Sequence, residues 1–185
     1  MARIGAPIGG EKPVLALDID GVFNAMPPEF NTPEPYTYSP PAGFIENPDP
    51  INGLYNPEHG LWIKEFLPIF EVVYLTSHGG DSHEDIGVPL DLPELDWVDY
   101  SKYEMAGSKS IDNVNYARRL AVEHFFADRP LVWIDDDHQP RDFDWAAQRS
   151  EQGLSTLIVK PIYYVGLERH HIDEVHEWYG AQAIE

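Results

Sequence analysis

Two acidic residues directly follow a short apolar run, and their spacing could place both carboxylates on one ligand. The run Val14–Leu17 is followed by Asp18, Ile19, Asp20 and Gly21. A short apolar run bounded by turn signals predicts a buried parallel strand, and ligands bind beyond the carboxyl ends of such strands. Side chains at positions i and i+2 leave a strand on the same side. Asp18 could therefore act as a nucleophile and Asp20 could transfer protons, while Gly21 would permit a sharp turn or a close backbone approach.

Polar side chains also follow two later apolar runs. The runs at 72–75 and 131–134 end in hydroxyl and carboxyl groups: Thr76 and Ser77 after the first, and Asp135, Asp136 and Asp137 after the second. A helical pattern of apolar residues begins beside Lys109 and continues to position 125. Phosphoryl transfer needs a carboxylate nucleophile, carboxylates that bind Mg²⁺, and a hydroxyl and a cation for the phosphoryl oxygens. The sequence therefore predicts these groups at one edge of a sheet.

The order of these segments resembles the haloacid dehalogenase (HAD) superfamily of phosphatases. The matching segments, LALDIDGVFN, VVYLTS, SKSI and LVWIDDD, extend from about Val14 to Val159. The ending VGL before a Trp-containing helix also resembles small HAD proteins of actinobacteria and their phages, including HAD domains attached to RNA-repair proteins. The resemblance implies a Rossmann-like α/β core, in which a parallel sheet has helices on both faces. It also implies a Mg²⁺-dependent phosphohydrolase that cleaves a phosphomonoester through an aspartyl phosphate.

The resemblance implies catalytic roles for four residues. Asp18 would attack phosphorus, and Asp20 would protonate the leaving group and then activate water. Asp20 would have to hold a proton part of the time, whereas metal-bound Asp18 would not. Thr76 would donate a hydrogen bond to a phosphoryl oxygen, and Lys109 would neutralise charge on Asp18 and the phosphoryl group. Gly21 would lie beside the substrate.

The same resemblance implies a Mg²⁺ site built from oxygen atoms. Asp18 and Asp135 would bind the ion directly, and Asp20 would contribute its backbone carbonyl. Asp136 would bind directly or through water, and Asp137 could replace it or could cap the next helix. Adjacent acids after a buried strand cost energy unless a cation offsets their charge.

Several alternatives remain open from the sequence alone. Ser77 could replace Thr76 if the register shifts, and it would then also bind substrate. Lys102 competes with Lys109. The histidines show no zinc-ligand spacing. Three of them, His78, His83 and His138, lie near the predicted site, and His170 and His171 are adjacent in the last predicted helix. We interpret His78 and His138 as candidate substrate-side residues, and the 170–171 pair as exposed helix surface.

Composition sets bounds on the function. The 185 residues fit a single domain, 1–185, and the absence of cysteine excludes disulfides and thiolate chemistry. A net charge of −20 disfavours binding to an extended nucleic acid but permits a small phosphorylated substrate, a mononucleotide or a nucleic-acid end. The N-terminus lacks a signal-peptide core, and no apolar stretch is long enough to span a membrane, so we expect a soluble cytoplasmic protein.

The segment 25–60 holds nine of the 17 prolines together with several aromatic residues. Because proline removes backbone donors, long helices and central strands are disfavoured there. We interpret this segment as an aromatic flap or small cap over the site, with a passively packed loop as the alternative. We expect helices from 57–58 to Pro68, at 110–126, at 143–152 and at 167–179, the last ending before Gly180, and further strands near 97–98 and 157–159.

Three other readings are less consistent with the sequence. A phosphoacceptor receiver domain would need two more strands between Asp136 and Lys160, for which there is no room. A dinucleotide-binding protein is disfavoured because no G-x-G-x-x-G opens a helix. A HAD-fold binding or regulatory module without turnover is the remaining alternative, and the presence of both Asp18 and Asp20 argues against it.

Overall fold

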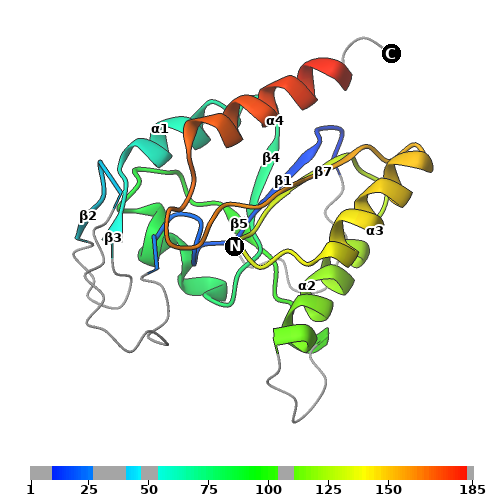
Figure 1. The fold of residues 1–185 in the computed structure, drawn as a ribbon, viewed down its shortest axis with the longest axis horizontal. Helices are drawn as coiled ribbons and strands as arrows, with labels where there is room; N and C mark the ends of the chain where they lie inside the picture. The colour runs from blue at the N-terminus through cyan, green and yellow to red at the C-terminus, as the bar shows by residue number, and fades with distance from the viewer. Residues whose placement is uncertain (1–9, 27–40, 47–53, 104–110, 183–185) are drawn as a thin grey trace.

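A five-stranded parallel sheet, with the strand order β5-β4-β1-β6-β7, forms the centre of the molecule (Figure 1). The structure is a computed structural model that describes residues 10–26, 41–46, 54–103 and 111–182. The strands of the sheet are β1 Val14–Leu17, β4 Glu71–Tyr74, β5 Asp96–Trp97, β6 Leu131–Ile134 and β7 Thr156–Val159. The α-helices are α1 Glu58–Lys64, α2 Ile111–Phe125, α3 Pro140–Glu151 and α4 Arg169–Gln182. Short 3-10 turns lie at Gly79–Asp81 and Ser101–Tyr103, and a π-helical turn lies at His83–Gly87.

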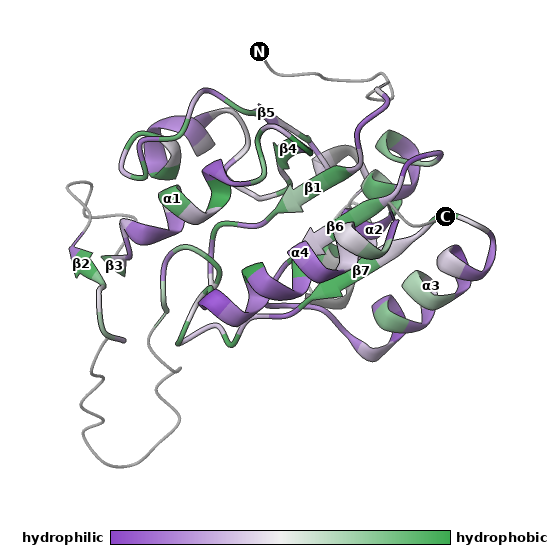
Figure 2. Cartoon of the chain, turned by 90° about the horizontal axis from the view of Figure 1, so that it is seen from above, coloured by the Kyte–Doolittle hydropathy of each residue, from purple (hydrophilic) through white to green (hydrophobic). Residues whose placement is uncertain are grey.

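Alternate residues of the buried strands pack against helices on opposite faces of the sheet. Leu15 and Leu17 of β1 face α1 and α4, whereas Val14 and Ala16 face α2 and α3. In Figure 2 strands such as β7 are largely hydrophobic, whereas the helices mix hydrophobic and hydrophilic residues. A strand that is covered on both faces must be apolar throughout, as the run in β1 is. The expected α/β class with helices on both faces is therefore confirmed.

The strand register brings the predicted polar groups to one edge of the sheet. Leu17 at the end of β1 lies opposite Tyr74 of β4 and Ile134 of β6. The Asp18 amide donates to the carbonyl of Ile134 (3.0 Å), so the chain leaves both strands at the same level. Residues that follow β1, β4 and β6 consequently meet at the carboxyl edge.

Only part of the segment 25–60 belongs to the described residues; 27–40 and 47–53 lie outside them, and with them Phe30, Tyr36 and Tyr38. The described part contains a two-stranded antiparallel pair, β2 Ile45–Glu46 and β3 Leu54–Tyr55. Tyr55 of β3 also forms a backbone bridge with Asn24. In Figure 2 strands β2 and β3 lie beyond the end toward which the β1 arrow points. The Tyr55 ring is buried in the core, and the Phe44 ring packs against the His59 ring. Both aromatic rings therefore have a packing role within the fold.

Several helix boundaries differ from the prediction. Helix α1 ends at Lys64, before Pro68, and α4 continues through Gly180, so the predicted stop there was wrong. Helix α3 begins three residues early, because Pro140 occupies its first turn and Gln139 forms a capping box with Asp142. Among the described residues, no helix combines the length and the apolar character that crossing a bilayer requires.

Candidate functional site

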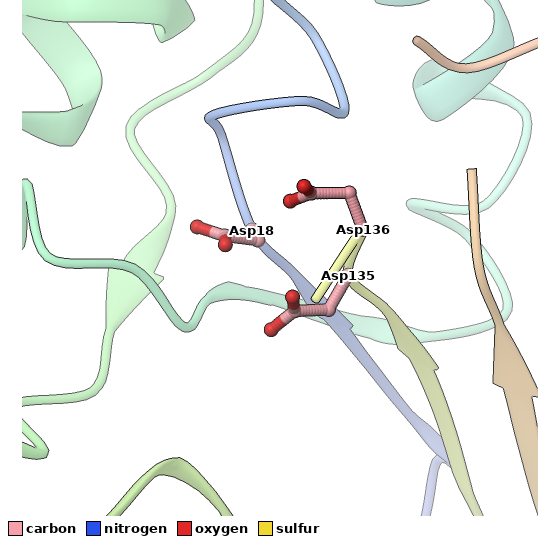
Figure 3. Close-up of side chains that lie close together, drawn as sticks. All are labelled: Asp18, Asp135 and Asp136. Atoms are coloured by element: carbon pink, nitrogen blue, oxygen red, sulfur yellow. The ribbon is translucent and has the colours of Figure 1, made fainter. Parts of the chain in front are cut away.

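Three carboxylates converge at the carboxyl edge of the sheet. Asp18 follows β1, and Asp135 and Asp136 follow β6; each offers an oxygen within 4.8 Å of the others. Figure 3 shows the three side chains directed to the same side of the strands. Asp18 and Asp135 are each only 1% exposed, and Asp136 is partly exposed. Of the two acids that follow Asp135, the cluster contains Asp136 and not Asp137.

A buried arginine that the sequence analysis did not identify bridges two of these carboxylates. The Arg118 guanidinium lies 3.0 Å from Asp18 Oδ2 and also donates to both oxygens of Asp135, at 3.1 and 3.0 Å. Tyr100 lies beside it, with the guanidinium carbon 5.5 Å from the ring centroid. Lys109, predicted for this charge, lies outside the described residues, and of Lys102 no side-chain position is described.

The helix pattern contained a signal for Arg118. Helix α2 buries Ala117, Ala121, Val122 and Phe125 against the sheet. Arg118 falls within that stripe, since positions three and four residues apart share a helix face. A cation on a buried stripe needs a buried anion, and the acids after β1 and β6 are the available partners. The prediction considered only lysines near the helix start and therefore missed it.

Burial and mutual repulsion raise the pKa values of the clustered acids. Burial raises the pKa of Asp18 to about 7, and nearby Asp135 adds to the rise, while Arg118 opposes it. Burial and the charges of Asp135 and Asp18 raise the pKa of Asp136 to about 8. The pKa of Asp135 is also raised by burial. One guanidinium thus does not compensate three carboxylates.

The donor set of this cluster fits a hard divalent cation. Each carboxylate has about four lone-pair sites, and Asp18 uses one for the Ile19 amide (2.8 Å) and one for Arg118. Acceptor positions on Asp18 and Asp136 therefore remain for a metal ion. Oxygen-only ligands with excess negative charge suit Mg²⁺ better than softer metals.

Asp20 lies beside the cluster and is held by two polar partners. Asn24 Nδ2 donates to Asp20 Oδ1 at 2.8 Å, and His78 Nε2 lies 3.3 Å from Asp20 Oδ2. The other His78 nitrogen, Nδ1, lies 2.6 Å from Asp85 Oδ2. The bond to His78 is the main cause that lowers the pKa of Asp20, and the same bond raises the pKa of His78 to about 9. These shifts favour a protonated His78 and an ionised Asp20. The sequence predicted that Asp20 would hold a proton more readily than Asp18, whereas the pKa of Asp18 is raised and that of Asp20 is lowered.

The remaining candidate positions differ in their surroundings. The Thr76 hydroxyl is buried close enough to Asp18 to lower its pKa, yet it has no well-formed hydrogen bond in the described part of the chain. Ser77 is exposed and lines a separate hollow of about 100 Å³ with Trp97 and Tyr100. Gly21 has φ +68°, and a Cβ there would lie 2.5 Å from the Asp136 carboxyl carbon. Only glycine therefore fits the turn against the cluster.

The expectation for His138 was wrong, and that for the pair 170–171 was right for His170, which is exposed, but wrong for His171. His138 does not face the cleft, because it is buried behind β6 with Nε2 3.2 Å from the carbonyl of Trp133, and burial lowers its pKa to about 4. His171 is buried rather than exposed, and its Nδ1 accepts a hydrogen bond from the Glu168 amide (3.0 Å) at the start of α4. Asp137 does not cap α3, since Gln139 does.

A cleft of about 560 Å³ opens beside the cluster. Its described lining combines acidic side chains, one guanidinium and two larger side chains of apolar character: Asp18, Asp20, Asp136, Asp137, Arg118, Met26 and Tyr163. The acids and Arg118 lie together, so the cleft has a reactive end and an apolar border.

Comparison of the chain with protein-family models, with curated proteins and with solved structures gave no match. The chemistry of the site is therefore inferred from its own groups. These groups are a carboxylate cluster with excess negative charge, a buried guanidinium that bridges two of its members, a buried hydroxyl beside Asp18 and a carboxylate held by an imidazole.

Proposed function

We propose that this protein is a Mg²⁺-dependent phosphohydrolase of the HAD type that cleaves phosphomonoesters through an aspartyl phosphate on Asp18. The observation that carries the proposal is the convergence of Asp18, Asp135 and Asp136 at a cleft, with Arg118 bridging the first two. A buried cluster of this charge is costly unless it binds a cation. The order of the segments along the chain, which resembles that superfamily, adds independent support.

Asp18 is suited to be the nucleophile because its position is restrained on two sides. The Ile19 amide and the Arg118 guanidinium hold its two oxygens. One oxygen of Asp18 would form a bond to phosphorus while the ester P–O bond breaks and the leaving oxygen departs. Asp18, Asp135 and Asp136 would hold Mg²⁺, which when bound would polarise the phosphoryl group and favour the ionised form of the acids.

Arg118 would supply positive charge beside Asp18, the role that the sequence also predicts for Lys109, which lies outside the described residues. Its guanidinium neutralises part of the charge on Asp18, so that an anionic phosphoryl group can approach. Its bonds to Asp135 keep both carboxylates in one orientation, which is the positioning that in-line transfer needs. The Thr76 hydroxyl, which is buried beside Asp18, would donate to a phosphoryl oxygen.

Asp20 and His78 would handle the proton together. Before reaction the proton is on the imidazole, which faces the ionised Asp20. It would pass through Asp20 to the departing oxygen, which leaves as an alcohol. In the second step Asp20 would accept a proton from the water that attacks phosphorus, which releases phosphate and regenerates the Asp18 carboxylate.

Turnover of an aryl phosphate with and without Mg²⁺ tests this proposal. We expect hydrolysis that requires Mg²⁺ and that is abolished in Asp18→Asn, which keeps the shape of the side chain but removes the nucleophile. Asp144→Asn is the matched control, because Asp144 is an exposed acid on α3. Acid quenching during turnover should trap phosphate on the wild-type chain but not on Asp18→Asn.

Undiminished turnover in Asp18→Asn would exclude the covalent mechanism. Binding of Mg²⁺ at the cluster without turnover of any phosphomonoester would instead favour the alternative, a binding or regulatory module with this fold.

A further inference from the structure

Apolar side chains border the acidic cleft on the side of the loop that follows β7. Met26 and Tyr163 line the cleft directly. Met26 is 40% exposed, and the neighbours Ile162 and Tyr164 are 49% and 39% exposed. We call these four residues the Tyr163 wall. Large apolar side chains are rarely left exposed together beside a polar cleft unless they contact a ligand or a partner.

Backbone hydrogen bonds fix the Tyr163 wall to the turn that carries Asp18 and Asp20. The Met26 amide donates to the carbonyl of Tyr163 (2.8 Å), and the Leu167 amide donates to the carbonyl of Val22 (2.8 Å). The loop itself closes because the amides of 165 and 166 both donate to the carbonyl of Ile162 (2.7 and 2.8 Å). In Figure 1 this loop, orange, lies beside the blue segment that follows β1.

The rings of the wall are also arranged by contact with one another. The Tyr163 and Tyr164 rings are perpendicular, with their centroids 5.1 Å apart. Because the backbone contacts do not depend on the side chains, replacing Tyr163 should leave the loop in place. The wall is therefore a preformed surface at a constant position relative to Asp18.

The charges of the cleft restrict what can lie against this wall. Its described lining holds four carboxylates and a single cation, Arg118, which is bound to Asp18 and Asp135. A second anionic group on a substrate would lie near Asp20 and Asp136, where the cations Arg118 and His78 are already bound to carboxylates. Like charges at this range are repelled, so the part of the substrate beyond the phosphoryl group should be neutral.

We propose that Met26 and Tyr163 form the leaving-group subsite, and that the substrate is a phosphomonoester whose leaving group is a neutral, flat ring. This inference rests on the proposed function. A ring placed on Tyr163 gains aromatic contact and burial of apolar area, whereas a short alkyl or polyhydroxy group gains little of either.

Three alkyl-type esters test the subsite without changing the reacting atoms: benzyl, 4-carboxybenzyl and propyl phosphate, each compared by kcat/KM with Mg²⁺. We expect the wild type to favour benzyl over 4-carboxybenzyl phosphate by about tenfold, because the added carboxylate faces the acids. Tyr163→Ala should lose about tenfold more with the benzyl ester than with the propyl ester, since an aromatic pair and its buried area are removed.

Conservative and matched variants complete the experiment. Tyr163→Phe keeps the ring and should retain most of the preference for the benzyl ester. Tyr116→Ala should retain the wild-type ratio, because Tyr116 is an exposed tyrosine of α2 that does not line the cleft. Met26→Ala provides a second change in the wall and should reduce the same ratio.

Equal losses with benzyl and propyl esters in Tyr163→Ala and Met26→Ala, or no discrimination against the added carboxylate, would overturn the leaving-group subsite while the phosphatase proposal stands. Absence of turnover of all three esters by the wild type would overturn the proposed function and this inference with it.

Discussion

Replacement of Arg118 by methionine should destabilise the protein far more than loss of an ordinary surface ion pair. Arg118 is 7% exposed and binds two carboxylates that are each 1% exposed. Methionine fills a similar volume but leaves Asp18 and Asp135 buried without their cation. Breaking a buried ion pair in this way costs about 3–5 kcal/mol. In a chain of this size each kcal/mol lowers Tm by about 2–4 °C, so the expected loss is about 6–20 °C.

Thermal unfolding followed by circular dichroism, in a chelator and again with Mg²⁺, measures this effect. Arg169→Met is the control, because Arg169 pairs with Glu65 at the exposed surface (2.6 Å), where ion pairs are screened by solvent and contribute little to stability. Added Mg²⁺ should raise the Tm of Arg118→Met more than that of the wild type, since the ion replaces part of the lost positive charge. The Tm of Arg118→Lys should lie between that of Arg118→Met and that of the wild type.

A similar small Tm change in Arg118→Met and Arg169→Met would refute this reasoning. It would mean that the two carboxylates are protonated or solvated in the folded protein and do not depend on Arg118. The charge argument for a metal at this cluster would then fail as well.

Three further predictions concern the same site. In a chelator, stability should fall as pH rises from 6.5 to about 8, because the raised folded-state pKa values of Asp18 and Asp136 favour proton binding to the folded chain, whereas below 6.5 the lowered pKa values of the buried histidines act in the opposite direction; urea unfolding across this range measures it, and a rise of stability with pH would contradict it. Asp136→Asn should weaken Mg²⁺ binding, measured by calorimetry, more than Asp137→Asn does, and equal losses would remove Asp136 from the metal site. His78→Gln should lower kcat about 10²-fold for alkyl esters but much less for a nitrophenyl ester, which needs little protonation; Asp85→Asn should show the same trend more weakly, and a loss independent of the leaving group would indicate only a structural role.

Two features could be predicted from the sequence: the α/β class, and the convergence of the acids that follow β1 and β6. Both follow from local information, because short apolar runs that alternate with helices predict parallel strands, and parallel strands share a carboxyl edge. The turn at Gly21 was also readable, since a residue without Cβ after the two aspartates indicates a close backbone approach. Boundaries were less predictable: α4 continues through Gly180 to Gln182, because a single glycine lowers helix propensity by only about 1 kcal/mol and does not by itself end a helix.

The tertiary structure alone decided which side chains accompany those acids. Arg118 reaches Asp18 because the rotation of α2 against the sheet directs one position of its buried stripe to the carboxyl edge. His78 meets Asp20 and Asp85 because the turns after β4 fold back, and Tyr163 meets Met26 because a loop far along the chain pairs with the turn after β1. Such contacts depend on how elements distant in the sequence pack. Periodicity places Arg118 on the buried stripe of α2, but neither periodicity nor spacing along the chain contains the contacts of His78 and Tyr163.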